Sequence, residues 1–262
     1  MNTSSEASLR VQSPRPTVTR RLWFGWVAFW AWFFTATMSP LLVLHSAFEP
    51  TTATLRRWMR PWARLITGMS GIRLDVEQRA PLPEGPVIFV ANHANSLDIM
   101  TTMLGLDRPF LYMARHEVRS WPFVGWVLEK SACLFINRDN PRQAVRDLRE
   151  AASRVQAGDS VLLFPEGGRG HDHGLQPFMR GPFMLAVEAG VPLVPVTLVG
   201  NTGVLAERSF AAQPGRVRLV TDAAIPTEGL SRSDTAELAE RVRRVVQAEL
   251  ATYGEPAELE GH

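Results

Sequence analysis

The chain of 262 residues is long enough to bury one sizeable core, and this length suits one domain with an appendage better than two full domains. Its composition, with 45% hydrophobic and 21% charged residues, is typical of a globular protein and excludes wholesale disorder. The one cysteine, Cys133, excludes an internal disulfide framework.

Positive charge is concentrated near the N-terminus. Residues 1–64 contain eight arginines against Glu6 and Glu49, a net charge of +6, although the whole chain carries only +2. A basic end on a mildly acidic body predicts that one end of the protein contacts a polyanionic surface, either nucleic acid or anionic lipid.

The neighbouring sequence favours lipid. Leu22–Leu44 is a run of 23 residues without a charge, and it contains four tryptophans. This length is sufficient to cross a bilayer, and tryptophan is typical of the membrane interface. A cleavable signal peptide is disfavoured, because no small-x-small cleavage site follows the run cleanly. We therefore expect an anionic membrane lipid as a partner, and no nucleic acid.

Arginines flank the apolar run on both sides, and two membrane topologies remain open. A single span would leave one positive flank on the wrong side, whereas a hairpin that dips into one leaflet keeps both flanks cytoplasmic. Pro40 is expected to kink or end a helix within the run. The returning arm would be Thr52–Ser70, whose apolar residues repeat at helical spacing opposite the arginines, as in an interfacial amphipathic helix.

These features predict a domain organisation and a location. We expect a disordered basic tail over residues 1–19, a membrane-associated helical hairpin over 20–72, an α/β domain over 73–253 and a flexible tail over 254–262. The hairpin would hold the protein on the cytoplasmic face of the inner (plasma) membrane.

Beyond a polar, turn-rich stretch at Gln78–Pro86, short β-branched runs alternate with helical patterns. This alternation predicts an α/β fold with a mostly parallel central sheet flanked by helices. The expected strands are Val87–Ala91, Phe110–Ala114, Cys133–Ile136, Ser160–Phe164, Leu193–Leu198 and Val217–Thr221. The expected helices are Ser96–Gly105, Trp121–Glu129, Pro141–Ala157, Gly181–Ala189 and Ser233–Tyr253.

A histidine and an aspartate follow the first of these strands. His93 lies directly after Val87–Ala91, and Asp98 lies five residues later, in the first turn of the next helix. The carboxyl ends of strands hold the sites of α/β sheets, and a carboxylate can orient an imidazole so that it takes a proton from a hydroxyl. The alternative is a helix-capping aspartate beside an incidental histidine.

Two further strand ends carry charged residues. The stretch 164–170 reads Phe-Pro-Glu-Gly-Gly-Arg-Gly, a glycine-rich turn whose backbone N–H groups and Arg169 suit a phosphate. Arg138 ends a second strand. A plain connecting loop and a surface arginine are the respective alternatives.

Taken together, these motifs resemble the glycerophospholipid acyltransferase family, in particular its bacterial 1-acylglycerol-3-phosphate acyltransferases. Four blocks of the family occur in the right order. They are Asn92-His93…Asp98, residues 132–138 (with Ala132 where glycine is usual), residues 164–170, and Val191-Pro192-Leu193-Val194-Pro195-Val196.

The resemblance implies transfer of an acyl group from acyl-CoA or acyl-carrier protein to the free hydroxyl of lysophosphatidate, which forms phosphatidate without a further cofactor. His93 would be the general base and Asp98 its partner. The phosphate-bearing acceptor would be bound by Arg138, Glu166, Arg169 and Arg115, with Gly167 contributing a backbone N–H.

Two departures from the family pattern leave the identity of the acceptor lipid undecided. Gly168 and Gly170 replace two hydroxyl residues of the usual Glu-Gly-Thr-Arg-Ser block, so another lyso-lipid, such as a lyso-ornithine lipid, is an alternative acceptor. A lipid hydrolase and a non-catalytic membrane-binding module are less favoured. The chain has no Gly-x-Ser-x-Gly elbow, which disfavours a covalent acyl-enzyme. His171-Asp172-His173 lacks an obvious third ligand, and we expect no metal.

Overall fold

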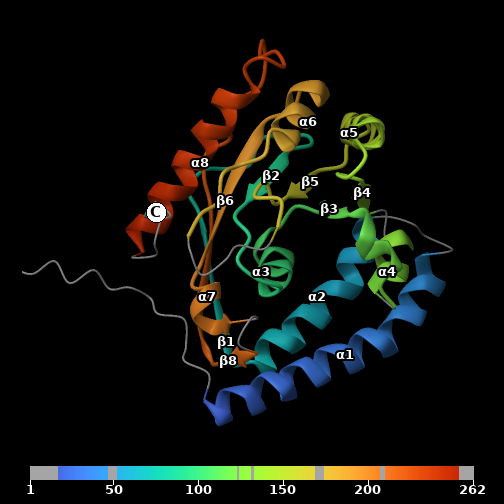
Figure 1. Cartoon of the computed structure of the whole chain (residues 1–262), viewed down its shortest axis with the longest axis vertical. Coiled ribbons are helices and arrows are strands. Elements are labelled where there is room, and N and C mark those ends of the chain that lie inside the picture. Colours follow the sequence, from blue (N-terminus) through green and yellow to red (C-terminus); the bar gives the residue numbers. More distant parts are fainter. Residues whose placement is uncertain are drawn as a thin grey trace, which may run out of the picture.

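The computed structural model describes residues 17–46, 52–122, 124–130, 133–168, 174–206 and 210–253. Seven strands form one sheet in the order β1-β9-β6-β2-β5-β3-β4 (Figure 1). These strands are β1 (Ile72–Gln78), β2 (Ile88–Ala91), β3 (Leu111–Arg115), β4 (Leu134–Ile136), β5 (Val161–Leu163), β6 (Leu193–Val199) and β9 (Gly215–Thr221). The predicted α/β class with a mostly parallel sheet is confirmed.

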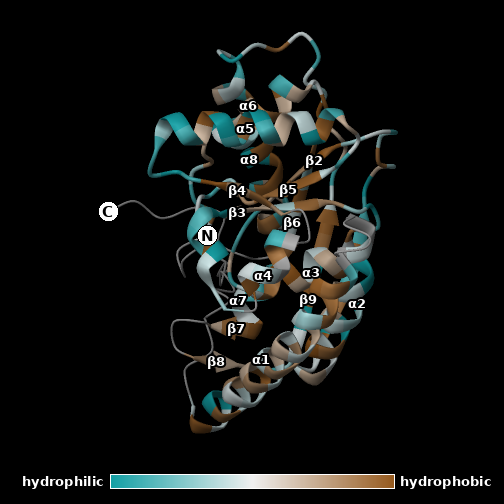
Figure 2. Ribbon diagram, turned by 90° about the vertical axis from the view of Figure 1, so that its right-hand side faces the viewer, coloured by the Kyte–Doolittle hydropathy of each residue, from teal (hydrophilic) through white to brown (hydrophobic). Residues whose placement is uncertain are grey.

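The centre of the sheet is parallel and buried on both faces. Strands β4, β3, β5, β2 and β6 pair in parallel, whereas β9 is antiparallel to β6 and parallel to β1. Every residue of β2, β5 and β6 is buried, and these strands are coloured as hydrophobic in Figure 2. Continuous apolar runs are expected where helices cover both faces of a parallel sheet.

Helices cover each face of the sheet. One face packs on α5 (Pro141–Gln156), α6 (Gly181–Ala189) and α8 (Thr235–Thr252). The other face packs on α3 (Leu97–Gly105), on α2 (Thr52–Met69) and in part on α4 (Val124–Lys130). Among the described residues there are also a 3-10 helix, η1 (His116–Ser120), a short helix, α7 (Asn201–Val204), and a small hairpin of β7 (Leu205–Ala206) and β8 (Ala211–Ala212).

The first helix, α1 (Val18–Ser46), is long and apolar enough to cross a membrane, and little of it is buried in the protein. It lies along one end of the domain, with its N-terminal part against β8 and its other part against α2 and α4 (Figure 1). It exposes eight large apolar side chains: Val18, Leu22, Trp26, Phe29, Trp32, Phe33, Leu41 and Leu44.

The expectation that Pro40 would end a helix or kink it is wrong as regards an end, because α1 continues through Pro40 to Ser46. A proline removes one helical hydrogen bond, and packing on both sides of it offsets this loss. Ser39 and Leu42 are buried, and Leu42 packs against Trp58 and Met59 of α2.

The second helix differs from the expected interfacial helix in the direction of its apolar face. Ala63 and Ile66 are buried, and Trp62 packs into the core below α3. On its other sides, Arg56 and Arg60 donate hydrogen bonds of 2.9 and 2.8 Å to the carbonyls of Leu106 and Leu104, at the end of α3. These two arginines therefore stabilise a helix C-terminus, and α1 presents the apolar outer surface.

The predicted elements of the body are observed with shifts of at most three residues at their ends, and Gly181–Ala189 has the predicted bounds. The sequence reading omitted β1, whose residues alternate between apolar and charged, and it omitted the short elements α7, β7, β8 and η1. Residues 1–16 and 254–262 of the predicted tails lie outside the described residues, and α1 already begins at Val18.

Candidate active site

His93 lies at the carboxyl end of β2, in the middle of the sheet. The loop between β2 and α3 is held by Asn92, whose buried side chain accepts a hydrogen bond from the backbone N–H of Leu198 (2.7 Å) and donates one to its carbonyl (2.9 Å). Leu198 belongs to β6, the neighbour of β2. The loop is therefore fixed at the edge where α/β sheets place their sites.

His93 and Asp98 form the predicted pair. His93 Nδ1 is 2.7 Å from Asp98 Oδ2, and Asp98 is fully buried. The same carboxylate oxygen accepts the backbone N–H groups of Ala94 (2.6 Å) and Asn95 (3.0 Å). Because this oxygen acts as an acceptor, Nδ1 carries the proton and Nε2 presents its lone pair. His93 is thus arranged as a base.

The second oxygen of Asp98 has a partner that sequence reasoning missed. Asn201, at the start of α7, donates from Nδ2 to Asp98 Oδ1, and its own backbone carbonyl accepts from Asn95 Nδ2 at 2.9 Å. Asn201 is buried and lies 103 positions beyond Asp98 in the sequence. No local pattern connects the two residues. Their contact arises only when α7, which follows β6, packs against the loop after β2.

An aromatic ring covers one face of the histidine. The Phe164 ring stacks on the His93 imidazole, with centroids 4.0 Å apart and planes 17° from parallel. Phe164 follows β5, the other parallel neighbour of β2. Stacking restricts rotation of the imidazole, and the His93 side chain remains 13% exposed. The ring is therefore oriented and still open to a substrate.

Glu166 lies behind His93. Its Oε1 accepts the backbone N–H of His93 at 2.6 Å, and its Oε2 accepts that of Gln176 at 2.9 Å. Burial raises the pKa of Glu166 to about 7, and the two N–H donors oppose this rise. The sequence placed Glu166 among the substrate-binding residues, whereas in the structure both of its oxygens hold main-chain groups around the base.

The glycine-rich turn is packed against Arg138. Arg138 Nη1 donates to the carbonyl of Gly167 at 2.7 Å and lies 3.6 Å from Met179 Sδ. Gly167 has a φ of +78°, and a Cβ atom there would collide with the Met179 sulfur. Glycine is thus required on conformational and steric grounds. Gly168, in contrast, has open space around it.

Arg115 and Arg138 are close enough for their charges to interact. Burial and the charge of Arg115 lower the pKa of Arg138. Arg115 itself is half-exposed and pairs with Glu117 at 3.0 Å. Two cations held near each other at strand ends form a suitable place for an anion. Arg169, the third predicted cation, lies outside the described residues.

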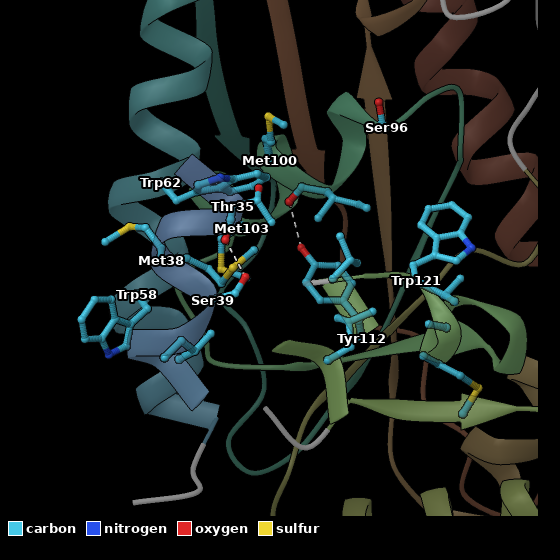
Figure 3. A pocket seen from close by; sticks show the side chains of 18 of the residues that line it. Thr35, Met38, Ser39, Trp58, Trp62, Ser96, Met100, Met103, Tyr112 and Trp121 are labelled. Atoms are coloured by element: carbon cyan, nitrogen blue, oxygen red, sulfur yellow. Dashed lines mark hydrogen bonds between the residues drawn. The ribbon is translucent and has the colours of Figure 1, made fainter. Parts of the chain in front are cut away.

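An apolar cavity of about 360 Å³ (Figure 3) is lined in part by Phe164, whose ring stacks on His93. Ser96 and Phe164 line it, as do Trp58 and Trp62 of α2. Its side chains come from α1, α2, α3, β3, η1 and α4, and most of them are apolar, with Arg115 as a charged exception. The Thr35 and Ser39 hydroxyls donate to α1 carbonyls. The cavity therefore suits a long hydrocarbon chain more than a polar ligand.

Cys133, the other candidate nucleophile among the described residues, is not arranged for chemistry at this site. Cys133 is buried, and burial raises the pKa of its thiol to about 12, which makes it a poor nucleophile. Within the described ranges, no group of three or more His, Cys, Asp or Glu side chains is arranged to hold a metal ion. His171 and His173 lie outside those ranges.

The chain is similar to known acyltransferases over most of its length. A sequence model described as Acyltransferase matches residues 73–199. A 1-acyl-sn-glycerol-3-phosphate acyltransferase of Chlamydomonas reinhardtii is 30% identical over 245 residues, which cover 90% of this chain and 70% of that protein. A lyso-ornithine lipid O-acyltransferase of Pseudomonas aeruginosa is 31% identical over 225 residues, which cover 79% of this chain and 82% of that protein.

The fold is also known from a crystal structure. The 1-acyl-sn-glycerophosphate acyltransferase of Thermotoga maritima superposes with a TM-score of 0.75 at 24% identity, and the match covers 90% of this chain and 96% of that one. The sequence similarity, the shared fold and the His93–Asp98 pair all indicate the same family. The chain therefore belongs to the acyltransferase family that includes the 1-acyl-sn-glycerol-3-phosphate acyltransferases, and it is an enzyme.

Proposed function

We propose that the protein transfers a fatty acyl group from acyl-CoA or acyl-carrier protein to the free hydroxyl of 1-acyl-glycerol-3-phosphate, which yields phosphatidate and the free thiol carrier. The observation that carries the proposal is the 2.7 Å contact between His93 Nδ1 and the buried carboxylate of Asp98, beside an apolar cavity. The names of the relatives support the acyl acceptor.

In the proposed reaction His93 acts as a general base. Nε2 takes the proton of the acceptor hydroxyl while the hydroxyl oxygen forms a bond to the thioester carbonyl carbon. The carbon–sulfur bond then breaks, and the imidazolium returns its proton to the departing thiolate. Asp98 stabilises the imidazolium that exists between these two transfers. No acyl-enzyme intermediate is needed, which agrees with the buried, protonated thiol of Cys133.

The phosphate of the acceptor would lie between Arg115 and Arg138, with Arg169 as the third cation. This arrangement is supported by the mutual repulsion of Arg115 and Arg138, which a bound dianion would relieve. Glu166 would act through the main chain of His93 rather than on the phosphate, because both of its oxygens accept backbone N–H groups.

The acyl chain of the donor would occupy the 360 Å³ cavity. Its end at Phe164 and Ser96 is adjacent to His93, so a chain lying inside would present its thioester to the base. The body of the carrier, which is polar, would remain outside. Burial of each methylene group contributes about 0.8 kcal/mol to binding.

The protein would lie on the membrane by way of α1, at the cytoplasmic face of the inner membrane. Large apolar side chains cover the outer surface of this helix, and its inner surface contacts β8, α2 and α4 along most of its length. A helix attached to the domain along its side favours a monotopic arrangement over a single span.

Mass spectrometry of the products tests the proposal. Purified enzyme with one acyl donor and a mixture of lyso-acceptors is expected to form phosphatidate, and His93→Ala is expected to lose transfer while still binding vesicles. Wild-type turnover by His93→Ala would overturn the role of the base. Release of free fatty acid without any acceptor would instead indicate a hydrolase.

A second acceptor is favoured by one comparison. The lyso-ornithine lipid O-acyltransferase is as similar to this chain as the phosphatidate-forming relative, and Gly168 stands where the family usually has a hydroxyl residue. In the same mixture, preferential acylation of lyso-ornithine lipid would identify that acceptor. Such a result would leave the chemistry of His93 unchanged.

A further inference from the structure

A second apolar cavity, of about 230 Å³, lies beneath the N-terminal part of α1. It is lined by Phe24, Ala28 and Ala31 of α1, by Ile66 of α2, and by residues of β1, α7 and β8. Helix α1 covers one side of it, and Phe24 contacts Phe210 edge-on with ring centroids 5.6 Å apart.

The polar side chains in its wall are already bonded within the protein. The Ser70 hydroxyl donates to the carbonyl of Ile66 at 2.6 Å, and Gln213 Nε2 donates to that of Gly203 at 2.7 Å. The wall therefore presents apolar atoms to the cavity, and its ligand must be a hydrocarbon.

The two cavities meet at the catalytic loop. Ser96 and Met100 line both of them, and Ser96 is three residues from His93. The second cavity also contains Leu97, the first residue of α3. Two hydrocarbon sites thus approach one base from different directions.

The sheet order separates the second cavity from the proposed phosphate site. His93 follows the central strand β2. Arg115 ends β3 and Arg138 lies two residues beyond β4, and both strands are on one side of β2. The second cavity includes Ile72 of β1, at the opposite edge of the sheet (Figure 1). The base therefore lies between a cationic site and an apolar site.

This arrangement matches the chemistry of a lyso-acceptor, whose free hydroxyl lies between a head group and an existing acyl chain. We propose that the second cavity binds the resident acyl chain of the acceptor, while the first cavity binds the chain being transferred. The inference rests on the proposed function. With the phosphate at the arginines and the middle hydroxyl at His93, the resident chain extends toward Ser96 and the cavity under α1.

Access from the lipid phase supports this occupant. The helix that closes the cavity exposes Leu22, Trp26 and Phe29 on its outer side, and Trp32 both lines the cavity and is exposed. A single-chain lipid enters from the membrane that this surface contacts, whereas the soluble donor carrier reaches the site from water. The two substrates then need not pass each other.

Two substitutions on the same face of α1 test the assignment. Ala28→Phe fills the second cavity, and Thr35→Phe, seven residues and two turns later, fills the first. Ala28→Phe is expected to raise KM about tenfold for long-chain acceptors, the loss of about two buried methylene groups. KM for an acceptor with a two-carbon chain should stay within about twofold, and activity with it shows that the variant is folded.

Thr35→Phe is expected to shift the preference for acyl donors toward shorter acyl chains. The dependence of the acceptor KM on acceptor chain length should remain as in the wild type. The assignment of the second cavity is overturned if Ala28→Phe changes the donor chain-length preference instead of the acceptor KM. It is also overturned if Ala28→Phe changes neither quantity. Failure of the wild-type enzyme to acylate any lysophospholipid would overturn the proposed function itself. Failure of the cavity assignment alone would leave wild-type acylation intact.

A labelling experiment decides the matter if Ala28→Phe is inactive with every acceptor. A lysophosphatidate with a diazirine at the end of its acyl chain is irradiated with the wild-type enzyme, and the label is located by tandem mass spectrometry. Labels within Phe24–Trp32 or at Leu205 are expected. Labels confined to Met103 and Leu128, which line only the first cavity, would overturn the inference.

Discussion

Substitution of Asp98 by asparagine separates the charge of this residue from its shape. In the wild-type protein Oδ2 accepts three hydrogen bonds, from His93 Nδ1 and two backbone N–H groups, and Oδ1 accepts one from Asn201. An asparagine at position 98 keeps its amide oxygen toward His93. In the opposite orientation its NH₂ group, itself a donor, would face three hydrogen-bond donors. With the oxygen toward His93, its NH₂ group faces the NH₂ group of Asn201.

The expected effect on catalysis follows from the lost charge. An imidazolium and a carboxylate in contact have charge centres roughly 4 Å apart, and at an effective dielectric constant of about 20 they attract by about 4 kcal/mol. Since each 1.36 kcal/mol is tenfold in rate, kcat of Asp98→Asn should fall by about 10³-fold. The donor–donor contact costs about 1–3 kcal/mol of stability, which lowers Tm by roughly 2–12 °C.

Initial rates of acyl transfer and thermal unfolding measure the two effects separately. The matched control is Asn201→Ala, which removes the partner of Oδ1 but leaves the carboxylate on His93. Its Tm should fall by a similar amount, while kcat should decrease only about tenfold, since the charge remains. A kcat for Asp98→Asn within tenfold of the wild type would refute the reasoning, as would equal losses in the two variants.

Three further predictions concern the turn and the phosphate site. Gly167→Ala should lower both Tm and activity, because its positive φ costs about 1–2 kcal/mol and its new Cβ has no space, whereas Gly168→Ala, in open space, should leave Tm within about 1 °C. Because burial raises the pKa of Glu166 to about 7 from 4.5, the folded protein retains a proton that the unfolded chain releases, so the free energy of unfolding should fall by about 3 kcal/mol as the pH rises from about 4.5 to 7. Denaturant unfolding of Glu166→Gln should lack this decrease, and identical pH dependences would contradict the assignment. Arg115→Ala should raise KM for a phosphate-bearing acceptor about tenfold or more with kcat little changed, and Arg119→Ala, similarly exposed, should not; equal KM values would remove Arg115 from the site.

The pairing of His93 with Asp98 could be predicted from the sequence for a local reason. His93 and Asp98 are five residues apart across one strand-to-helix turn, and the strand before them is a continuous apolar run, so both identity and position could be predicted. The turn at 164–168 was visible for the same reason. The parallel sheet followed from the alternation of strand and helix patterns, since a parallel connection requires a crossover.

The sequence does not indicate which way a side chain points when its hydrogen-bonding partner is far away in the sequence. The family resemblance implied that Glu166 binds the acceptor, and no local pattern indicates that its oxygens accept the backbone N–H groups of His93 and Gln176. The apolar face of α2 was expected at the membrane interface, and it packs into the core instead, while Arg56 and Arg60 bind carbonyls at the end of α3. In each case the charge was predictable and the contact was not.

The candidate His–Asp pair, the apolar first helix and the alternation that produces the sheet could be predicted from the sequence, because these features depend on residues within a few turns of one another. Only the tertiary structure brought Asn201 to Asp98 and placed α1 over two cavities that meet at Ser96. Contacts of this kind join distant segments of the chain, since Asn201 and Asp98 are 103 positions apart. They are decided by which faces pack when the helices close on the sheet, and local periodicity carries no information about them.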